Sequence, residues 1–207
     1  MGAALNGAQV DEIVRFTRAR VEEYSKNETI SLENRDEKTL FCVKSGLIYL
    51  CAENEEYEKS ILRVFRPGEF FSEDMVLNLT HGVSYLIAKY KSQVIGIGRA
   101  EMERLCKTQA DWSERIERLF VRQLPESMMA QNYILHQKSL RMKLIYYFKH
   151  ECAVQGTTEL TLPMPFSDLA DYLNADRSAM MKEITRMKQE GLLLGTRRNV
   201  IFRDPSD

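Results

Sequence analysis

The sequence predicts an α+β protein, with short strands in the first half and helices in the second. From Tyr24 to Ile97, short β-branched and aromatic runs alternate with turn residues. From Asp111 onward, apolar residues recur at the spacing of an amphipathic helix. From Phe166, two helical patterns precede a hairpin pattern. Grouped strands followed by grouped helices are typical of an α+β arrangement.

The composition indicates a globular cytoplasmic protein of one large or two small domains. The 207 residues are 44% hydrophobic, which is enough for packed cores. No apolar run approaches the eighteen or so residues of a membrane span, and the first residues lack the pattern of a secretory signal. Gly2 follows Met1, but Asn6 stands where myristoylation needs Ser or Thr. The four scattered cysteines form no CxxC pair, so reduced thiols are expected.

The first half predicts a small barrel or sandwich of short strands, preceded by a short helix from about Val10 to Arg20. Regular turn signals separate the runs. The expected strands are Leu40–Val43, Gly46–Cys51, Ile61–Phe65, Val83–Tyr90 and Gln93–Ile97.

The middle of the chain predicts a short helix, Arg99–Lys107, and then a long helical region with one apolar stripe. Such a stripe is often the core of its own domain, but this order of elements favours a seam with a second copy of the chain. Pro125 lies within the region and predicts a kink or break near Leu124, because proline lacks a backbone donor. The expected dimer-interface residues are Ile116, Phe120, Leu124, Met128 and Leu135.

The stretch from Phe166 to Gly191 predicts a helix-turn-helix. Ser167 is the expected first cap, and Leu169, Ala170 and Leu173 supply an apolar stripe. Turn residues follow, and then a second helix that ends at Gly191. The turn is Asn174, Ala175 and Asp176, and the second stripe is Ala179, Met180, Ile184 and Met187. Alone, such a pattern is more often a structural helical hairpin with a solvated basic face than a DNA reader.

A basic hairpin after the second helix favours the DNA-binding interpretation. Leu192–Leu194 and Val200–Phe202 read as strands around a turn that holds Arg197 and Arg198. From Arg177 to Arg203 there are seven basic and two acidic residues, although the whole chain carries a net charge of −1. Local positive charge on a nearly neutral protein suits contact with phosphates.

The run DRSAMMKEITRMKQEGLL resembles the recognition segment of the Crp/Fnr superfamily of bacterial transcription regulators. The stretch FCVKSGLIYLCAENEEYEKSILRVFRPGEFF is similar to the β-roll of that family, a cyclic-nucleotide-binding-like double-stranded β-helix. The resemblance implies an effector-sensing roll (residues 1–107), a dimerisation helix (108–136) and a winged helix-turn-helix DNA-binding domain (137–207). Base-reading residues would be Arg177, Ser178 and Lys182, and phosphate-binding residues would be Arg186, Arg197 and Arg198.

The resemblance also implies partners and a mechanism of gating. A homodimer would read a palindromic operator in double-stranded DNA, RNA polymerase would be a further candidate partner, and a small-molecule effector would bias the spacing of the two recognition helices. The pattern implies no membrane partner, no catalytic residue and no metal site.

The effector pocket departs from the pattern of the cyclic-nucleotide-binding members. Gly68-Glu69 matches the start of their phosphate cassette, and Ser84 matches the hydroxyl residue at its end. Val83, however, stands where an arginine would neutralise the phosphate. We therefore expect that cAMP is not the natural effector. Glu69 also has a structural interpretation, as a carboxylate within a turn.

Two residues near this cassette could partly replace the missing arginine. His81 and Lys89 carry suitable donors, but neither offers the planar fork of a guanidinium. With Glu69 and Ser84, His81 completes the candidate effector pocket. A cyclic-nucleotide-responsive regulator with a divergent cassette stays an alternative.

Other sensing chemistries leave the cofactor unknown. A haem-based gas sensor would need an axial ligand from His81, His136 or His150, and a thiol switch would use Cys42 or Cys51. No cysteine precedes Cys42, which argues against an iron–sulfur cluster near the N-terminus. An enzyme is not expected, because the sequence shows no metal-ligand spacing, P-loop or nucleophile motif. A helix-turn-helix that contacts protein is a further alternative, which the basic hairpin disfavours.

Overall fold

The computed structural model describes residues 4–32, 39–53, 59–72 and 83–205. The chain divides into two compact units, which we call the N-terminal unit (Ala3–Gln123) and the C-terminal unit (from Leu124 onward). The predicted α+β class is confirmed, while the predicted three-part division of the chain stays a prediction. None of the described helices is both long and apolar enough to cross a membrane.

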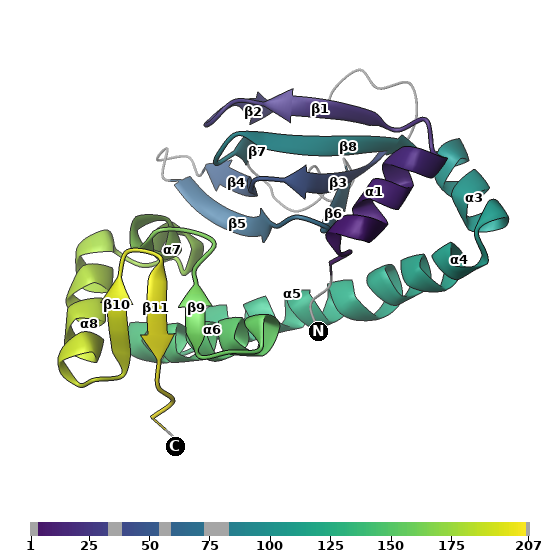
Figure 1. Cartoon of the computed structure of the whole chain (residues 1–207). Coiled ribbons are helices and arrows are strands. Elements are labelled where there is room, and N and C mark those ends of the chain that lie inside the picture. The colour runs from purple at the N-terminus through teal and green to yellow at the C-terminus, as the bar shows by residue number, and fades with distance from the viewer. Residues whose placement is uncertain (1–3, 33–38, 54–58, 73–82, 206–207) are drawn as a thin grey trace. The chain divides into compact units, whose positions relative to one another are not determined.

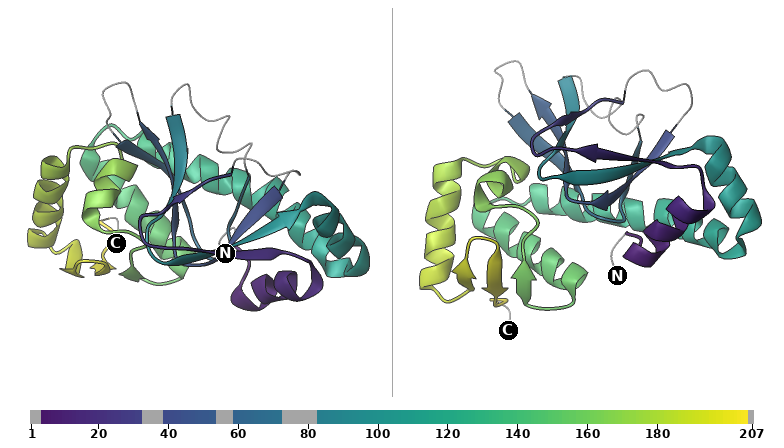
Figure 2. Two further views of the ribbon diagram at one scale, coloured as in Figure 1. Left: turned by 90° about the horizontal axis from the view of Figure 1, so that it is seen from above. Right: turned by 45° about the horizontal axis from the view of Figure 1, so that its top comes forward.

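The strands of the N-terminal unit form a β-roll of two antiparallel sheets, with helices at one end (Figures 1 and 2). One sheet has the order β1-β8-β3-β6 and the other the order β2-β7-β4-β5. The strands are β1 (Arg20–Tyr24), β2 (Thr29–Ile30), β3 (Thr39–Ser45), β4 (Ile48–Glu53), β5 (Lys59–Phe65), β6 (Phe70–Ser72), β7 (Val83–Ala88) and β8 (Ser92–Gly98). The helical segments are α1 (Gly7–Phe16), α3 (Arg99–Thr108), α4 (Ala110–Glu117) and the π-helical segment η1 (Arg118–Gln123).

Two apolar clusters hold this unit together. Residues from both sheets form the first, within which the ring centroids of Phe41 and Phe71 lie 5.2 Å apart and those of Phe65 and Phe71 lie 5.1 Å apart. The helices α1, α3 and α4 form the second cluster with strand residues, and it includes the buried side chain of Trp112. The roll therefore has an apolar interior and a helical pack at one end.

Helix α1 begins and ends earlier than the sequence predicts. Asn6 accepts a hydrogen bond from the backbone N–H of Gln9, whose side chain accepts in return from the backbone N–H of Asn6. This capping box starts the helix at Gly7, three residues before the predicted start. Thr17 ends it, because its hydroxyl donates to the carbonyl of Ile13 at 2.6 Å. The predicted end at Arg20 is therefore wrong, and that residue begins β1.

Near Leu124, where the sequence predicts a kink or break, the helical type changes but the helix continues without a gap. Helix α4 gives way to η1, and α5 begins at Leu124. Pro125 lies in the first turn of α5, where a missing backbone donor does least harm. The turn before it widens to the π-helical pattern, and the boundary between the two units falls at the same point.

The C-terminal unit packs helices against a three-stranded sheet of order β10-β11-β9. Phe148 and Phe202 stack in its core with centroids 5.3 Å apart. Ser139 caps α6, and Gly156 ends that helix at a φ of 69°. The elements are α5 (Leu124–Leu135), α6 (Leu140–Gln155), β9 (Glu159–Thr161), α7 (Phe166–Tyr172), α8 (Arg177–Gln189), β10 (Leu193–Thr196) and β11 (Asn199–Phe202).

Candidate nucleic-acid interface

Helix α7 starts at Phe166 rather than being capped by Ser167. The carbonyl of Pro165 accepts the backbone N–H of Leu169 at 3.0 Å, and the Ser167 hydroxyl instead contacts Asp168 at 3.2 Å. Proline is extended here, with φ −70° and ψ 162°, and it sets the entry to the helix. The prediction of a Ser167 cap is therefore wrong, because Pro165 is the cap residue and Ser167 already lies inside the helix.

The predicted turn and the ends of the second helix are confirmed. Asn174 adopts a left-handed conformation with φ 50°, and Asp176 caps α8 by accepting the backbone N–H of Ala179 at 2.8 Å. Gly191 follows the helix with φ 74°. The N–H of Leu192 donates to the carbonyl of Met187, which completes a glycine-ended helix.

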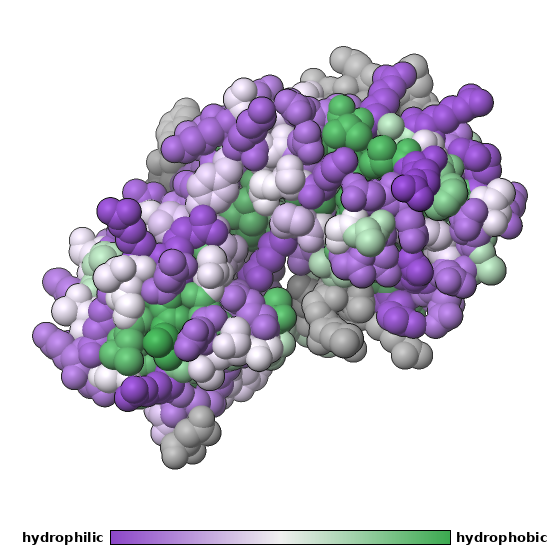
Figure 3. Space-filling model, in the orientation of Figure 1, coloured by the Kyte–Doolittle hydropathy of each residue, from purple (hydrophilic) through white to green (hydrophobic). Residues whose placement is uncertain are grey.

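Helix α8 buries one face and exposes the other. Met180, Ile184 and Met187 are buried in the core of the unit. The helix runs along one edge of the unit beside the β10–β11 hairpin, and polar residues dominate that edge (Figures 1 and 3). All three predicted base-reading residues lie on the exposed side, whose members are Arg177, Ser178, Ala179, Met181, Lys182, Thr185, Arg186 and Gln189.

Sequence reasoning missed Met181 and Thr185 on this exposed face. Both are exposed, and the Met181 side chain is 49% exposed even though methionine is apolar. Met181, Lys182 and Thr185 follow Ser178 by three, four and seven residues. Residues at this spacing lie on one face of a helix. That spacing is the signal that could have identified them.

Arg177 is held by a residue of the preceding helix. Its Nε donates to Asp171 Oδ1 at 3.2 Å, and its Nη2 donates to Asp171 Oδ2 at 2.8 Å. These hydrogen bonds, together with the charge of Asp171, raise the pKa of Arg177. The side chain of Arg177 remains 67% exposed, whereas that of Asp171 is 15% exposed. The guanidinium is therefore both ordered and accessible.

A network of charges joins the far end of α8 to α6. Arg141 donates from Nη1 to Glu183 at 3.0 Å and also binds Glu190 through both terminal nitrogens. Arg186 donates to the other oxygen of Glu183 at 3.3 Å, and its side chain is 67% exposed. The hydrogen bond from Arg141 lowers the pKa of Glu190. These contacts fix the orientation of α8 on α6 and leave Arg186 at the surface.

The two arginines of the hairpin turn have different surroundings. The last pair of residues between β10 and β11 is Thr196 with Asn199, so Arg197 and Arg198 form a two-residue turn. Arg197 is exposed with φ 54°. Arg198 donates from Nε to the carbonyl of Leu162 at 2.6 Å, and its own carbonyl accepts the N–H of Leu162 at 2.7 Å. Arg198 therefore anchors the hairpin to the segment after β9, and its predicted phosphate contact stays a prediction.

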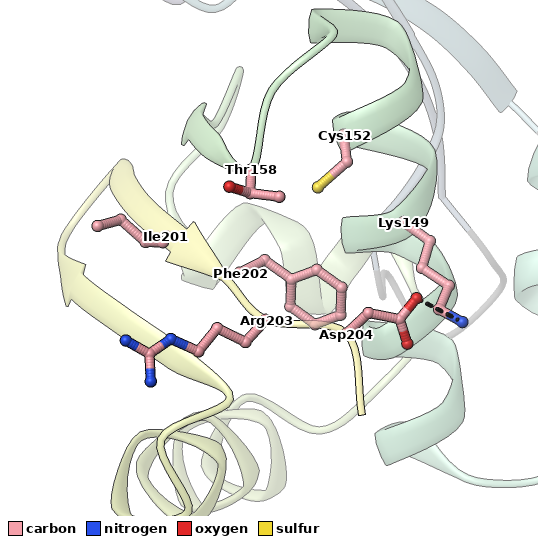
Figure 4. Close-up of a pocket in the computed structure, with 7 residues that line it drawn as sticks. All are labelled: Lys149, Cys152, Thr158, Ile201, Phe202, Arg203 and Asp204. Atoms are coloured by element: carbon pink, nitrogen blue, oxygen red, sulfur yellow. Dashed lines mark ion pairs between the residues drawn. The ribbon is translucent and has the colours of Figure 1, made fainter. Parts of the chain in front are cut away.

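A pocket elsewhere in this unit is lined by both basic and acidic residues. It measures about 710 Å³ and contains an ion pair of 2.8 Å between Lys149 and Asp204 (Figure 4). Arg203 extends away from Lys149 in this view, and burial raises the pKa of the Cys152 thiol at its wall. Its lining residues are Lys149, Cys152, Thr158, Ile201, Phe202, Arg203 and Asp204.

The predicted effector residues are not all in one place: Glu69 precedes a strand of one sheet, Ser84 lies on a strand of the other, and His81 is outside the described residues. Glu69 occupies the turn before β6, where its Oε2 accepts the N–H of Arg66 at 2.9 Å, which matches its structural interpretation. Ser84 lies on β7 opposite Ala52 of β4. The Lys89 ammonium lies 5.7 Å from the centroid of the Tyr49 ring.

Sequence reasoning also missed a buried cation in the roll. Arg63 is only 9% exposed, and its guanidinium carbon lies 5.1 Å from the centroid of the Phe65 ring. Phe65 pairs with Ile48 and Arg63 pairs with Leu50 of β4, and Ile48, Leu50 and Phe65 belong to the apolar interior, so Arg63 faces the inside as well. The alternation of residues along β5 is the signal that could have revealed a charge at an inner position.

Two residues of the predicted dimer stripe pack against their own unit. Ile116 and Phe120 contact the second apolar cluster, and the ring of Phe120 lies 6.0 Å from that of Phe70. For these two, the core interpretation of the stripe fits better than an open seam. Met128 is 45% exposed and Leu135 is half-buried, while the Leu124 side chain lies outside the described residues. Other apolar residues exposed on η1 and α5 are Val121, Met129 and Tyr133.

Comparison with known proteins gives these features a family context. Residues 21–109 match the family described as "Cyclic nucleotide-binding domain". The chain is 23% identical over 136 residues to a probable transcriptional regulator, flp, of Lacticaseibacillus casei. That match covers 66% of this chain and 62% of the relative, so it spans less than two thirds of the relative's length.

Solved structures show the same fold. A mutant of CooA from Carboxydothermus hydrogenoformans has a TM-score of 0.72 at 17% identity, over 91% of this chain and 85% of that one. FixK2 from Bradyrhizobium japonicum has a TM-score of 0.68 at 16% identity, over 91% and 94%. A regulator of the Crp/Fnr family from Eubacterium rectale has a TM-score of 0.59 at 18% identity, over 98% and 93%.

The chain combines a β-roll with a winged helix-turn-helix. The N-terminal unit matches the cyclic nucleotide-binding domain family, and the chain as a whole has the fold of Crp/Fnr regulators. The resemblance to the Crp/Fnr superfamily that the sequence predicts is confirmed.

Proposed function

We propose that this chain is a sequence-specific DNA-binding transcription regulator that works as a homodimer in the cytoplasm. The observation that carries the proposal is the exposed polar and basic face of α8 beside a hairpin whose turn holds Arg197. A helix that buries an apolar face and exposes a polar face can enter a major groove, and the basic hairpin that follows it can act as a wing. It is a binding protein and not an enzyme.

The start of α8 reads base edges. Arg177 offers two parallel donors to the O6 and N7 of a guanine. Ser178 and Lys182 contact neighbouring bases, because they lie on the same exposed side. Met181 and the methyl group of Thr185 add apolar contact, which suits the methyl group of thymine.

Arg186, Arg197 and Arg198 bind phosphates. Arg186 and Arg197 are exposed, so their charges reach the surface. Arg198 also anchors the hairpin through Leu162, so it contributes less to DNA than Arg197 does. Each phosphate contact releases condensed counterions, which makes affinity fall as salt rises.

Two copies of the chain read a palindrome with half-sites about one helical turn, ~34 Å, apart. The exposed apolar residues of α5, Met128 and Met129, meet a second copy together with Leu124 and Leu135. RNA polymerase is a further partner of such a complex on DNA.

The β-roll senses a small molecule that is not cAMP. Val83 stands where a phosphate-binding arginine would be needed, and Glu69 is already engaged by its own turn. The predicted pocket of Glu69, Ser84 and His81 stays a prediction, because His81 lies outside the described residues. Calorimetric titration with cAMP and with cGMP tests this, and micromolar binding of either would overturn it.

A selection from random duplex DNA tests the proposed function. The protein should enrich a palindromic sequence, and its affinity for that sequence should fall steeply between low and moderate salt. Analytical ultracentrifugation of the complex should give two chains per duplex. Enrichment of no sequence, or affinity that does not depend on salt, would refute a DNA-binding role.

A further inference from the structure

Asp171 and Arg177 form a geometrically defined pair next to the face that would meet DNA. Asp171 lies on α7, and Arg177 is the first residue of α8. The carboxylate accepts from Nε at 3.2 Å and from Nη2 at 2.8 Å, which is a side-on, two-bond arrangement. The two helices of the motif are thus linked through a single guanidinium.

This pair adds little to stability. The arginine side chain is 67% exposed, and ion pairs at such exposed positions are screened by solvent. Its main physical effect is on the side chain itself, because a free arginine samples many rotamers that must be lost when it binds. Two hydrogen bonds to a carboxylate that is only 15% exposed fix the guanidinium before any ligand arrives.

The geometry also determines which donors point outward. A guanidinium carries five N–H groups in a planar fork. The edge formed by Nε and Nη2 is used by Asp171. The end formed by Nη1 and Nη2 presents another pair of parallel N–H groups, and this pair matches the two acceptors of guanine in the major groove.

We propose that Asp171 is a specificity-determining residue that positions Arg177 for reading a guanine. This inference rests on the proposed function and names the interaction that makes it selective. Asp171 also places a negative charge near the DNA. This charge repels the phosphates, and only a contact between Arg177 and its guanine offsets the repulsion. It therefore acts against non-specific binding as well as for the correct base.

The test compares Asp171→Asn with Asp168→Asn in the full chain. Asparagine keeps the shape of Asp171 but has one acceptor oxygen and no charge, so it cannot hold both donors. Asp168 lies on the same helix and contributes to the electrostatics of Arg177, so its replacement removes the same charge without removing the two hydrogen bonds. The duplex enriched by the wild-type protein, and its single-base-pair variants, serve as probes.

Asp171→Asn should lower discrimination at one G·C pair by roughly tenfold and leave the other positions unchanged. Both variants should bind unrelated duplex DNA slightly more tightly, because each lacks one negative charge. The melting temperature should stay close to that of the wild type. In an Arg177→Ala background, Asp171→Asn should cause no further loss of discrimination.

The inference is overturned if Asp171→Asn leaves discrimination unchanged. It is also overturned if discrimination falls equally at all positions or falls as much in Asp168→Asn. Failure of the proposed function would look different. In that case the wild-type protein would enrich no duplex at all, and the inference about Asp171 would fail with it.

Discussion

The backbone N–H of Leu5 donates to the carbonyl of Gly68 at 2.9 Å, and this contact brings the N-terminal segment against the turn before β6. A Cβ on residue 68 would lie 1.9 Å from the carbonyl oxygen of Leu5. Gly68 also has a φ of 83°, which favours glycine. The Gly68-Glu69 pair is thus explained by the packing of this turn, without any ligand.

Gly68→Ala should therefore destabilise the roll. A side chain here meets both the left-handed backbone and the Leu5 carbonyl, and we expect a loss of about 2–4 kcal/mol in the free energy of unfolding. Chemical denaturation measures it. Gly7→Ala is the matched control, because a Cβ there meets nothing within 4 Å and alanine favours a helix. Equal stability of the two variants would contradict this account.

The thiol of Cys42 should be inert in the folded protein. Burial, and to a lesser extent the charge of Glu69, raises its pKa to about 12. The thiolate is the nucleophile, and at pH 8 only on the order of one thiol in ten thousand is ionised, so alkylation of the folded protein should be very slow. Iodoacetamide labelling followed by peptide mass spectrometry should modify Cys42 only after unfolding in urea. Rapid labelling of the native protein would instead support a thiol switch at this residue.

Local patterns were sufficient to predict the helix-turn-helix but not the partners of each helix. The spacing of Leu169 and Leu173, and later of Ile184 and Met187, gives two apolar faces that the structure buries. The residue type of Asp176 alone predicts that it lies in the turn, and it caps α8. Such features depend on neighbours within a few residues, so the sequence carries them directly.

Long-range relations were harder to predict. The periodicity that includes Ile116 and Phe120 shows an apolar face but not whether that face meets the same chain or a copy of it, and both residues pack on their own cluster. The pairing of Asp171 with Arg177 depends on the angle between two helices, which no spacing reveals. Arg63 was missed because its neighbours gave an ordinary strand pattern.

The link between Arg141 and Glu190 should make stability depend on pH. The hydrogen bond from Arg141 lowers the pKa of Glu190 below its usual 4.5, so the folded state favours the ionised carboxylate. This contribution is fully present above pH 4.5 and is lost as the pH falls through the depressed pKa. The difference in melting temperature between the wild type and Glu190→Gln should therefore be constant above pH 4.5 and narrow below it.

Glu159→Gln is the control for that experiment, because it removes one negative charge from an exposed strand position of the same unit. Subtracting the change in melting temperature caused by Glu159→Gln from that caused by Glu190→Gln corrects for the loss of one negative charge. A difference between the wild type and Glu190→Gln that widens in acid would contradict the assigned sign.

Arg177→Ala should relax the sequence preference of the protein. The change removes two donors to a base, and the expected loss for the preferred duplex is about 1–3 kcal/mol. Gel-shift titrations with the enriched duplex and with its single-base variants measure both affinity and preference. Unchanged affinity together with unchanged preference would show that Arg177 reads no base.

Arg197→Ala and Arg198→Ala should separate contact with phosphate from support of the hairpin. Arg197 is exposed at the turn, so its loss should weaken binding to all duplexes alike and reduce the slope of log affinity against log salt by about 1. Arg198 binds the carbonyl of Leu162, so its loss should lower the stability of the C-terminal unit by about 1 kcal/mol as well. Filter binding across a salt series, with thermal denaturation of both variants, distinguishes the two roles. If Arg197→Ala left the salt slope unchanged, while Arg198→Ala reduced it without loss of stability, the assignments of the two arginines would have to be exchanged.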